Sequence, residues 1–148
     1  MKWYKECYKA VKEVYSERHS VTLVTLNGIT CCHSGLGKND EALKIYNKCY
    51  DIQKEDLGED HPDTLATLNN IANCLEKLCS LNEALEKYQE YYELQSKCLA
   101  KEHDDTLLTL KRIIVILEKQ VRFDDALKKC NELYDSMLTL RQPAPCLP

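Results

Sequence analysis

Three evenly spaced histidines are the first residues in this 148-residue chain that could hold a metal ion. His19, His61 and His103 recur every 42 residues. If each begins a helix in a stacked array, neighbouring helices lie about 8–10 Å apart. That is too far for one ion, which needs every ligand near about 2 Å. We therefore expect no metal or other cofactor, and we interpret these histidines as residues that cap backbone N–H groups at helix starts.

The nine cysteines do not spell out a zinc or redox motif, because no C-x-x-C occurs. An odd number of cysteines, without an apolar signal segment at the N-terminus, fits a reducing compartment. The chain is therefore predicted to be cytoplasmic. Cys31 and Cys32 would be reactive if exposed near cations, but Lys38, a turn away, is the closest cation in the sequence. Inert thiols are the favoured interpretation.

No arrangement of acid, base and nucleophile typical of an enzyme is present. The sequence contains no glycine-rich phosphate loop, no G-x-S-x-G and no H-E-x-x-H. His33 stands alone on an apolar face and is expected to pack there. The acidic pairs Asp40–Glu41 and Asp124–Asp125 each begin an expected helix, where they complement its dipole. The sequence therefore predicts a protein that is not an enzyme.

Composition limits the remaining classes of function. Apolar residues make up 44% of the chain, and Pro and Gly number only four each, which excludes fibrous and disordered classes. A net charge of −4 argues against a general nucleic-acid binder. The longest aliphatic run, residues 113–117, is far too short to span a membrane. We expect neither nucleic acid nor membrane as a partner.

A strict 42-residue repeat organises the chain, so that half a unit precedes three full ones. Tyr8 lies 42 residues before Tyr50, which extends the pattern backwards. The predicted boundaries are a leading helix 1–18, repeats 19–60, 61–102 and 103–140, and a Pro-rich tail 141–148. Positions that keep one residue type in all three copies include His19, His61 and His103; Thr22, Thr64 and Thr106; Leu26, Leu68 and Leu110; Ala42, Ala84 and Ala126; and Tyr50, Tyr92 and Tyr134.

Each unit is predicted to form two helices, because apolar residues such as Leu68, Ile71 and Leu75 recur at three- and four-residue steps. Pro62 suits a first helical position and Gly58 a helix end. The expected helices are 1–16, 20–36, 40–57, 62–79, 82–99, 104–120 and 124–140, and the tail cannot continue the last. The second helix of the first unit is expected to bury Ala42, Tyr46, Cys49, Tyr50 and Leu57. Tyr4, Tyr8, Tyr46, Tyr50, Tyr88, Tyr92 and Tyr134 are expected to pack between helices, whereas Tyr91 leaves that register and is a candidate to face outward.

Helical hairpins of this length cannot bury their apolar faces alone, so neighbouring units must stack. A small residue at Ala42, Ala84 and Ala126 lets two helices approach, and an aromatic follows four residues later at Tyr46 and Tyr88. These choices favour tetratricopeptide (TPR) over HEAT or armadillo repeats. The predicted fold class is all-α, a right-handed α-solenoid of TPR hairpins with about seven helices.

Residues 57–88, LGEDHPDTLATLNNIANCLEKLCSLNEALEKY, strongly resemble the 42-residue TPRs of kinesin light chains, a type also found in NB-ARC regulators. The resemblance covers nearly the whole chain. It implies a superhelix whose first helices line a concave groove that binds peptides of other proteins. Ile114 stands where the family prefers a small residue, and Cys79 and Val121 replace the turn glycine. Packing around the third unit is therefore expected to be non-standard.

The groove side of the first helices carries amides and cations. Asparagine can both donate and accept, so it can hold an extended peptide backbone, while Lys and Arg favour carboxylates. In the resembled family, asparagines and cations on these helices hold acidic motifs with an aromatic anchor; the matching positions are Asn69, Asn70, Lys111 and Arg112. An ordinary solvated face is the alternative. The expected groove residues are Asn27, Asn69, Asn70, Asn73, Lys77, Lys111, Arg112 and Lys119.

On the first of these helices, Gly28, Cys31, Ser34 and Gly35 leave the groove side nearly bare. This offers either space for a bulky ligand side chain or a weak helix. The leading hypothesis is a protein-interaction module, an adaptor or scaffold that binds a linear, acidic peptide of a partner. The alternatives are a structural spacer that self-associates through open solenoid ends, and a sensor region of a larger NB-ARC/TPR protein. The half unit at the start favours a fragment or a divergent short member.

Overall fold

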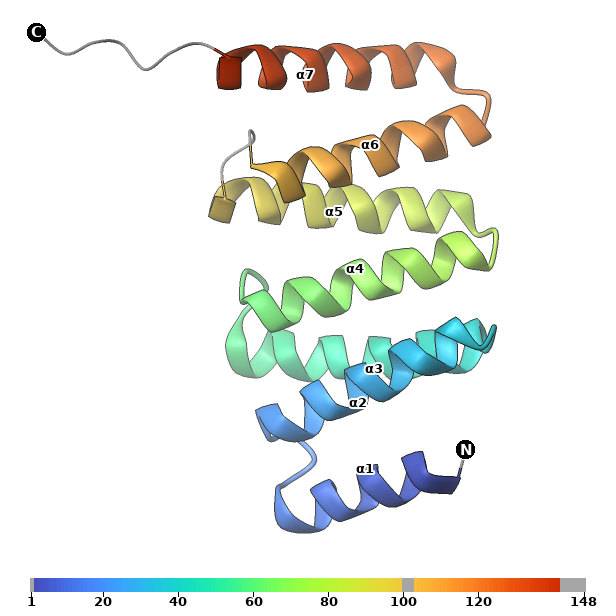
Figure 1. Ribbon diagram of the computed structural model, residues 1–148, viewed down its shortest axis with the longest axis vertical. Coiled ribbons are helices and arrows are strands. Elements are labelled where there is room, and N and C mark those ends of the chain that lie inside the picture. The colour runs from blue at the N-terminus through green and yellow to red at the C-terminus, as the bar shows by residue number, and fades with distance from the viewer. Residues whose placement is uncertain (1, 100–102, 142–148) are drawn as a thin grey trace, which may run out of the picture. The chain divides into compact units, whose positions relative to one another are not determined.

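The computed structural model describes residues 2–99 and 103–141, apart from the side chains of residues 2–5, 7 and 141. This part of the chain forms seven helices and no strand, so the predicted all-α fold is confirmed (Figure 1). Each predicted helix is present, and its ends agree within two residues. The helices are α1 (Lys2–Val14), α2 (Ser20–Gly35), α3 (Asn39–Leu57), α4 (Pro62–Lys77), α5 (Leu81–Leu99), α6 (Asp104–Lys119) and α7 (Phe123–Arg141).

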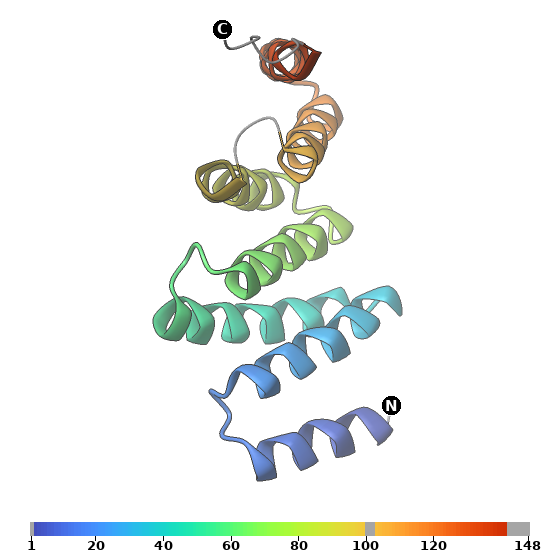
Figure 2. The same ribbon diagram turned by 60° about the vertical axis from the view of Figure 1, so that its left-hand side comes forward.

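The chain divides into two compact units, Met1–Lys87 and Tyr88–Pro148, with the division inside α5. In the first unit α3 packs between α2 and α4, and in the second α6 packs on α7, as Figures 1 and 2 show. The repeat boundaries at 19, 61 and 103 stay a prediction. Residues 100–102 and most of the expected tail 141–148 lie outside the described residues.

Histidine caps begin α2, α4 and α6. The Nδ1 atoms of His19, His61 and His103 each accept a hydrogen bond from the backbone N–H two residues later, at 3.2 Å. Each histidine has extended backbone angles, as an N-cap residue should. Pro62 then occupies the first turn of α4. The interpretation of these histidines as helix caps is confirmed.

The turns that close the α2–α3, α4–α5 and α6–α7 hairpins share one backbone pattern. In the first turn, Gly37 N–H donates to Ser34 O and Lys38 N–H donates to His33 O, which is a Schellman motif. The same two bonds recur in the other two turns. The residue equivalent to Gly37 has a positive φ each time, but it is Cys79 (φ 60°) and Val121 (φ 61°). Two side-chain-bearing residues are thus held in the left-handed region that favours glycine.

The first core is built largely as predicted. Ala42, Tyr46, Cys49 and Tyr50 are buried on α3, facing a buried row on α4. Leu57, however, is 37% exposed, so its predicted burial is wrong. Leu57 is the last residue of α3, directly before the C-cap Gly58. The buried row on α4 consists of Leu68, Ile71, Ala72, Cys74 and Leu75.

Buried polar side chains tie second helices to the following first helices within each unit. Thr67 Oγ1 on α4 donates to Gln53 Oε1 on α3 at 2.6 Å and accepts from Asn27 Nδ2 on α2. In the second unit, Thr109 Oγ1 donates to Gln95 Oε1 at 2.9 Å. Both glutamines are at most 2% exposed. A buried amide without such a partner would be costly, so these bonds fix the register of the packed helices.

The second core lies between α6 and α7. Ile114 is buried here although Thr30 and Ala72 hold the equivalent places in the first unit. Tyr134 on α7 is 62% exposed, so its predicted packing between helices is wrong. Its position recurs with Tyr50 and Tyr92, but the described part of the chain has no helix after α7 to cover it. The core side chains are Leu107, Leu110, Ile113, Ile114, Ile116, Leu117 and Ala126.

Candidate functional site

The asparagines predicted to line a groove in the first unit are half-buried on α4. Asn69, Asn70 and Asn73 all lie on the same side of the helix, outside the buried row. Asn27 on α2 is also half-buried, but its amide nitrogen donates to Thr67 and so holds α2 against α4. Asn27 thus has a structural contact that the sequence did not reveal.

Beside this row, Lys77 joins α4 to α2. Its Nζ atom donates to Ser34 Oγ at 3.0 Å, and Ser34 in turn donates to Asn39 Oδ1 at 2.8 Å. Ser34 is therefore buried rather than part of a bare surface, and that expectation is wrong. Gly28 and Gly35, by contrast, have open space where a Cβ would lie, and α2 continues through Gly28 without a break.

In the second unit, α6 presents four exposed residues at helical spacing, which we call the α6 face: Leu108, Lys111, Arg112 and Val115. The two aliphatic side chains are 53% and 44% exposed. Between them, Arg112 lies with its guanidinium carbon 6.0 Å from the ring centre of the buried Tyr88, and its Nη1 is 3.4 Å from the phenol oxygen. This cation–π contact orients the guanidinium. Lys119 is exposed one turn beyond Val115.

Tyr91 does not project outward as the sequence suggested. It is half-buried, and its hydroxyl oxygen accepts a hydrogen bond from Gln95 Nε2 at 3.2 Å. Burial raises the pKa of this phenol, and the nearby Asp105 carboxylate adds to the effect. Tyr91 is therefore part of the packing around α5.

A charged cluster at the start of the first unit escaped the sequence analysis. Glu17, between α1 and α2, forms ion pairs with Lys48 on α3 and, at 3.1 Å, with Lys12 on α1. These lysines, Lys48 foremost, lower the pKa of Glu17 to about 2. Arg18 pairs with Asp56 at 2.6 Å and Glu55 at 2.9 Å. The cluster joins helices and offers no catalytic geometry.

The described side chains give little support for a metal site or for a reactive thiol at Cys49. Within that part of the chain no group of three His, Cys, Asp or Glu residues could hold a metal ion. Burial raises the pKa of the Cys49 thiol to about 11, which makes it a poor nucleophile. No helix in the described ranges is long and apolar enough to cross a membrane.

The family profile described as tetratricopeptide repeat matches residues 2–55 and 32–97. The chain belongs to the tetratricopeptide repeat family. Comparison with curated proteins gave no match. Solved structures therefore provide the further comparison for its TPR hairpins.

Crystal structures of kinesin-light-chain-type repeats share the fold. Nearly identical TPR-like repeats of a candidate kinesin light chain from Podosopora anserina give a TM-score of 0.78 at 16% identity, covering 96% of this chain and 67% of that one. A point variant of the same repeats gives 0.78 at 18% identity, covering 95% and 67%. BtubC (BKLC) from P. vanneervenii gives 0.84 at 13% identity, with 99% of this chain covering 59% of it. The chain therefore shares the TPR solenoid fold of these structures.

Proposed function

We propose that this TPR chain is a non-enzymatic module that binds a linear, acidic peptide segment of a partner protein. TPR proteins generally act as protein-interaction scaffolds, and the matched family supports that broader role. The acidic character of the ligand, the cytoplasmic location and the residues involved are our proposal. The odd cysteine count supports a reducing compartment.

The α6 face is the observation that carries this proposal. Two cations stand between two exposed aliphatic side chains, and Tyr88 holds Arg112 in place. Such a row suits a peptide that presents carboxylates beside an apolar anchor. Arg binds a carboxylate through two parallel hydrogen bonds, and exposed apolar neighbours exclude water from the contact.

The α4 asparagines would add contacts to the peptide backbone that do not depend on the sequence of the peptide. Asn69, Asn70 and Asn73 offer donors and acceptors that match a peptide backbone. We assign Asn27 and Lys77 a smaller share, because the fold already uses Asn27 Nδ2 and Lys77 Nζ in bonds between α2 and α4. Lys119 would add a third cation to α6, next to the exposed Glu118.

Binding of labelled synthetic peptides tests the proposal. The probe is a glutamate-rich peptide with one central tryptophan, and its twin has every glutamate replaced by glutamine. Fluorescence anisotropy should show binding of the acidic peptide alone, weakened by salt. Lys111→Glu with Arg112→Glu should weaken it by about tenfold or more, since two reversed charges together remove roughly 1.4 kcal/mol.

The matched control is Lys97→Glu with Lys128→Glu, which reverses the same number of exposed charges outside the α6 face. The control should bind the acidic peptide as the parent does. Equal binding of the acidic and glutamine peptides, or equal losses in the two double variants, would refute the charge argument.

A further inference from the structure

An exposed thiol and a buried one lie where α2 packs on α4 in the first unit. Cys31 is an exposed residue of α2, and Cys74 on α4 is 1% exposed. The sulfur of Cys74 donates to Ser34 Oγ on α2 at 3.5 Å. Ser34 stands one turn after Cys31, so Cys74 points at the part of α2 that carries the exposed thiol.

The register of the two helices brings Cys31 next to Cys74. Asn27 on α2 bonds to Thr67 on α4, and Ser34 bonds to Cys74, so both contacts join residues 40 positions apart. Cys31 lies between Asn27 and Ser34 at helical spacing, on the side of α2 that meets α4. The same offset of 40 positions puts Cys31 less than one turn of α4 away from Cys74.

The hydroxyl of Tyr46 on α3 is a common neighbour of the two sulfurs. This side chain is 1% exposed. Its hydroxyl forms a hydrogen bond with Cys31 and interacts electrostatically with the thiol of Cys74. Burial raises the pKa of the Tyr46 phenol most, and the two thiols add to the effect. Two sulfurs from different helices therefore approach one side-chain oxygen.

Ser34 holds the buried thiol in a fixed direction. Its Oγ accepts from Cys74 Sγ and, at 3.0 Å, from Lys77 Nζ, and its hydroxyl donates to Asn39 Oδ1 at 2.8 Å. Three contacts thus fix the oxygen to which the sulfur of Cys74 is bonded. An oxidant in solution reaches Cys31 first, and a second thiol already stands beside it, as in redox-sensing pairs of cysteines.

We propose that Cys31 and Cys74 are a redox-active pair, which hydrogen peroxide oxidises to a disulfide between α2 and α4. The sulfur of Cys31 attacks the peroxide, so that an S–O bond forms, the O–O bond breaks, and a sulfenic acid and one water result. The sulfur of Cys74 then attacks that of Cys31. The S–S bond forms, the S–O bond breaks, and the hydroxyl leaves with the Cys74 thiol proton as a second water. Two thiols are oxidised, and one peroxide is reduced to two waters.

This pair arises from the packing of the helices and not from a sequence motif. The sequence favours inert thiols because Cys31 and Cys74 lie 43 residues apart. One repeat later the equivalent positions hold Asn73 and Ile116, which cannot form such a link. In a reducing compartment a disulfide of this kind is transient, since thiol reductants reverse it. The proposal does not depend on peptide binding, because neither thiol belongs to the α6 face.

Mass spectrometry after treatment with an equimolar amount of hydrogen peroxide tests the pair. The parent chain should lose two hydrogen atoms, and its proteolytic peptides should show Cys31 linked to Cys74. Cys74→Ser should stop at the sulfenic acid of Cys31, which dimedone traps. Cys31→Ser, at an exposed position, should fold as the parent does and form no disulfide with Cys74. Cys79→Ser and Cys98→Ser, which remove other exposed thiols, are the matched controls and should oxidise like the parent.

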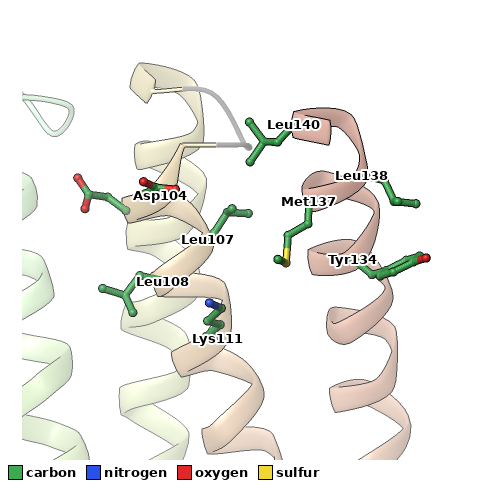
Figure 3. Close-up of a pocket in the computed structure, with 9 residues that line it drawn as sticks. Asp104, Leu107, Leu108, Lys111, Tyr134, Met137, Leu138 and Leu140 are labelled. Atoms are coloured by element: carbon green, nitrogen blue, oxygen red, sulfur yellow. The ribbon is translucent and has the colours of Figure 1, made fainter. Parts of the chain in front are cut away.

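Met137 on α7 provides an internal reference for the oxidant. Its side chain is 48% exposed and lines a pocket of about 660 Å³ between α6 and α7, as Figure 3 shows. Peroxide converts methionine to its sulfoxide, which adds one oxygen atom instead of removing two hydrogens. The disulfide should form while the Met137 peptide is still unmodified. Oxidation of Met137 before the two thiols would show that the pair has no particular reactivity, and would overturn the proposal.

Urea unfolding gives a second readout of the same link. A disulfide that closes a loop within correctly packed helices should raise the urea midpoint of the oxidised parent, and dithiothreitol should reverse the rise. Peroxide should leave the midpoint of Cys31→Ser unchanged. Cys32→Ser should still form the link, because Cys32 is not the partner. A disulfide that joins Cys31 to Cys32 or to a second chain, a lowered midpoint after oxidation, or no disulfide at all overturns the proposal.

Discussion

Replacing Thr67 with valine should destabilise the first unit more than the removal of a single hydroxyl group suggests. The change keeps the shape of the side chain and nearly the same helix propensity, and removes one hydroxyl. That hydroxyl donates to Gln53 Oε1 and accepts from Asn27 Nδ2. Gln53 is 1% exposed, so its oxygen cannot turn to water instead. A buried polar group left without a partner costs about 1–3 kcal/mol, and with the lost Asn27 bond we expect about 2–3 kcal/mol.

The repeat supplies its own controls at the same position. In the second unit, Thr109 Oγ1 donates to Gln95 Oε1 at 2.9 Å, as Thr67 Oγ1 does to Gln53 Oε1 in the first. Thr109→Val should therefore cost about 1–2 kcal/mol. Thr25 Oγ1 donates to the carbonyl of Val21 in its own helix. Thr25→Val should change stability by less than about 0.5 kcal/mol, because that carbonyl keeps its helical bond.

Urea unfolding followed by far-UV circular dichroism measures the three differences. The double variant Gln53→Met with Thr67→Val offers a second comparison, because replacing both partners by apolar side chains removes the unsatisfied amide. It should be more stable than the sum of the two single variants predicts. If the three threonine variants lose equal stability, or Thr67→Val loses no more than Thr25→Val, the assigned role of the bond is refuted.

Three further outcomes are expected. Val121→Gly should stabilise the chain by about 1 kcal/mol, because a left-handed backbone costs valine about 1–2 kcal/mol and glycine entropy returns part of it; a lower melting temperature would contradict this. Glu17→Gln should make the free energy of unfolding less dependent on pH in acid. The lowered pKa of Glu17 beside Lys48 gives stability that is present above about pH 4.5 and lost as pH falls toward about 2. An unchanged dependence of the urea midpoint on pH would oppose this. Cys49 should resist thiol reagents at pH 8 until the chain unfolds, while exposed Cys79 reacts at once; equal labelling rates would argue against its burial.

The helices and most of their core residues followed from periodicity alone. Ala42, Tyr46 and Leu68 recur at the repeat spacing, and a recurring apolar residue in stacked hairpins has a neighbour to pack on. The same logic failed for Tyr134, because its burial in the earlier copies depends on a helix that follows. Repetition in sequence predicts an environment only where the next copy is present.

Contacts between helices of different repeats were beyond the sequence argument. Thr67 and Gln53 lie 14 residues apart on separate helices, and their pairing depends on how those helices cross. A signal was available, since a threonine recurs at 25, 67 and 109 and a glutamine at 53 and 95. Ser34 failed for a related reason: its small size suggested a bare surface, but Lys77 reaches across from α4 to bond with it.

The hairpin turn shared by the three repeats affects how a TPR hairpin can be recognised. Two amide-to-carbonyl bonds close each turn whether glycine, cysteine or valine stands at the left-handed position. The family profile matches no further than residue 97, yet the α6–α7 hairpin beyond it keeps the same closure. The backbone geometry of the turn is therefore kept where the turn glycine is replaced. A comparison of turn geometry can identify a repeat that has lost this glycine from its sequence.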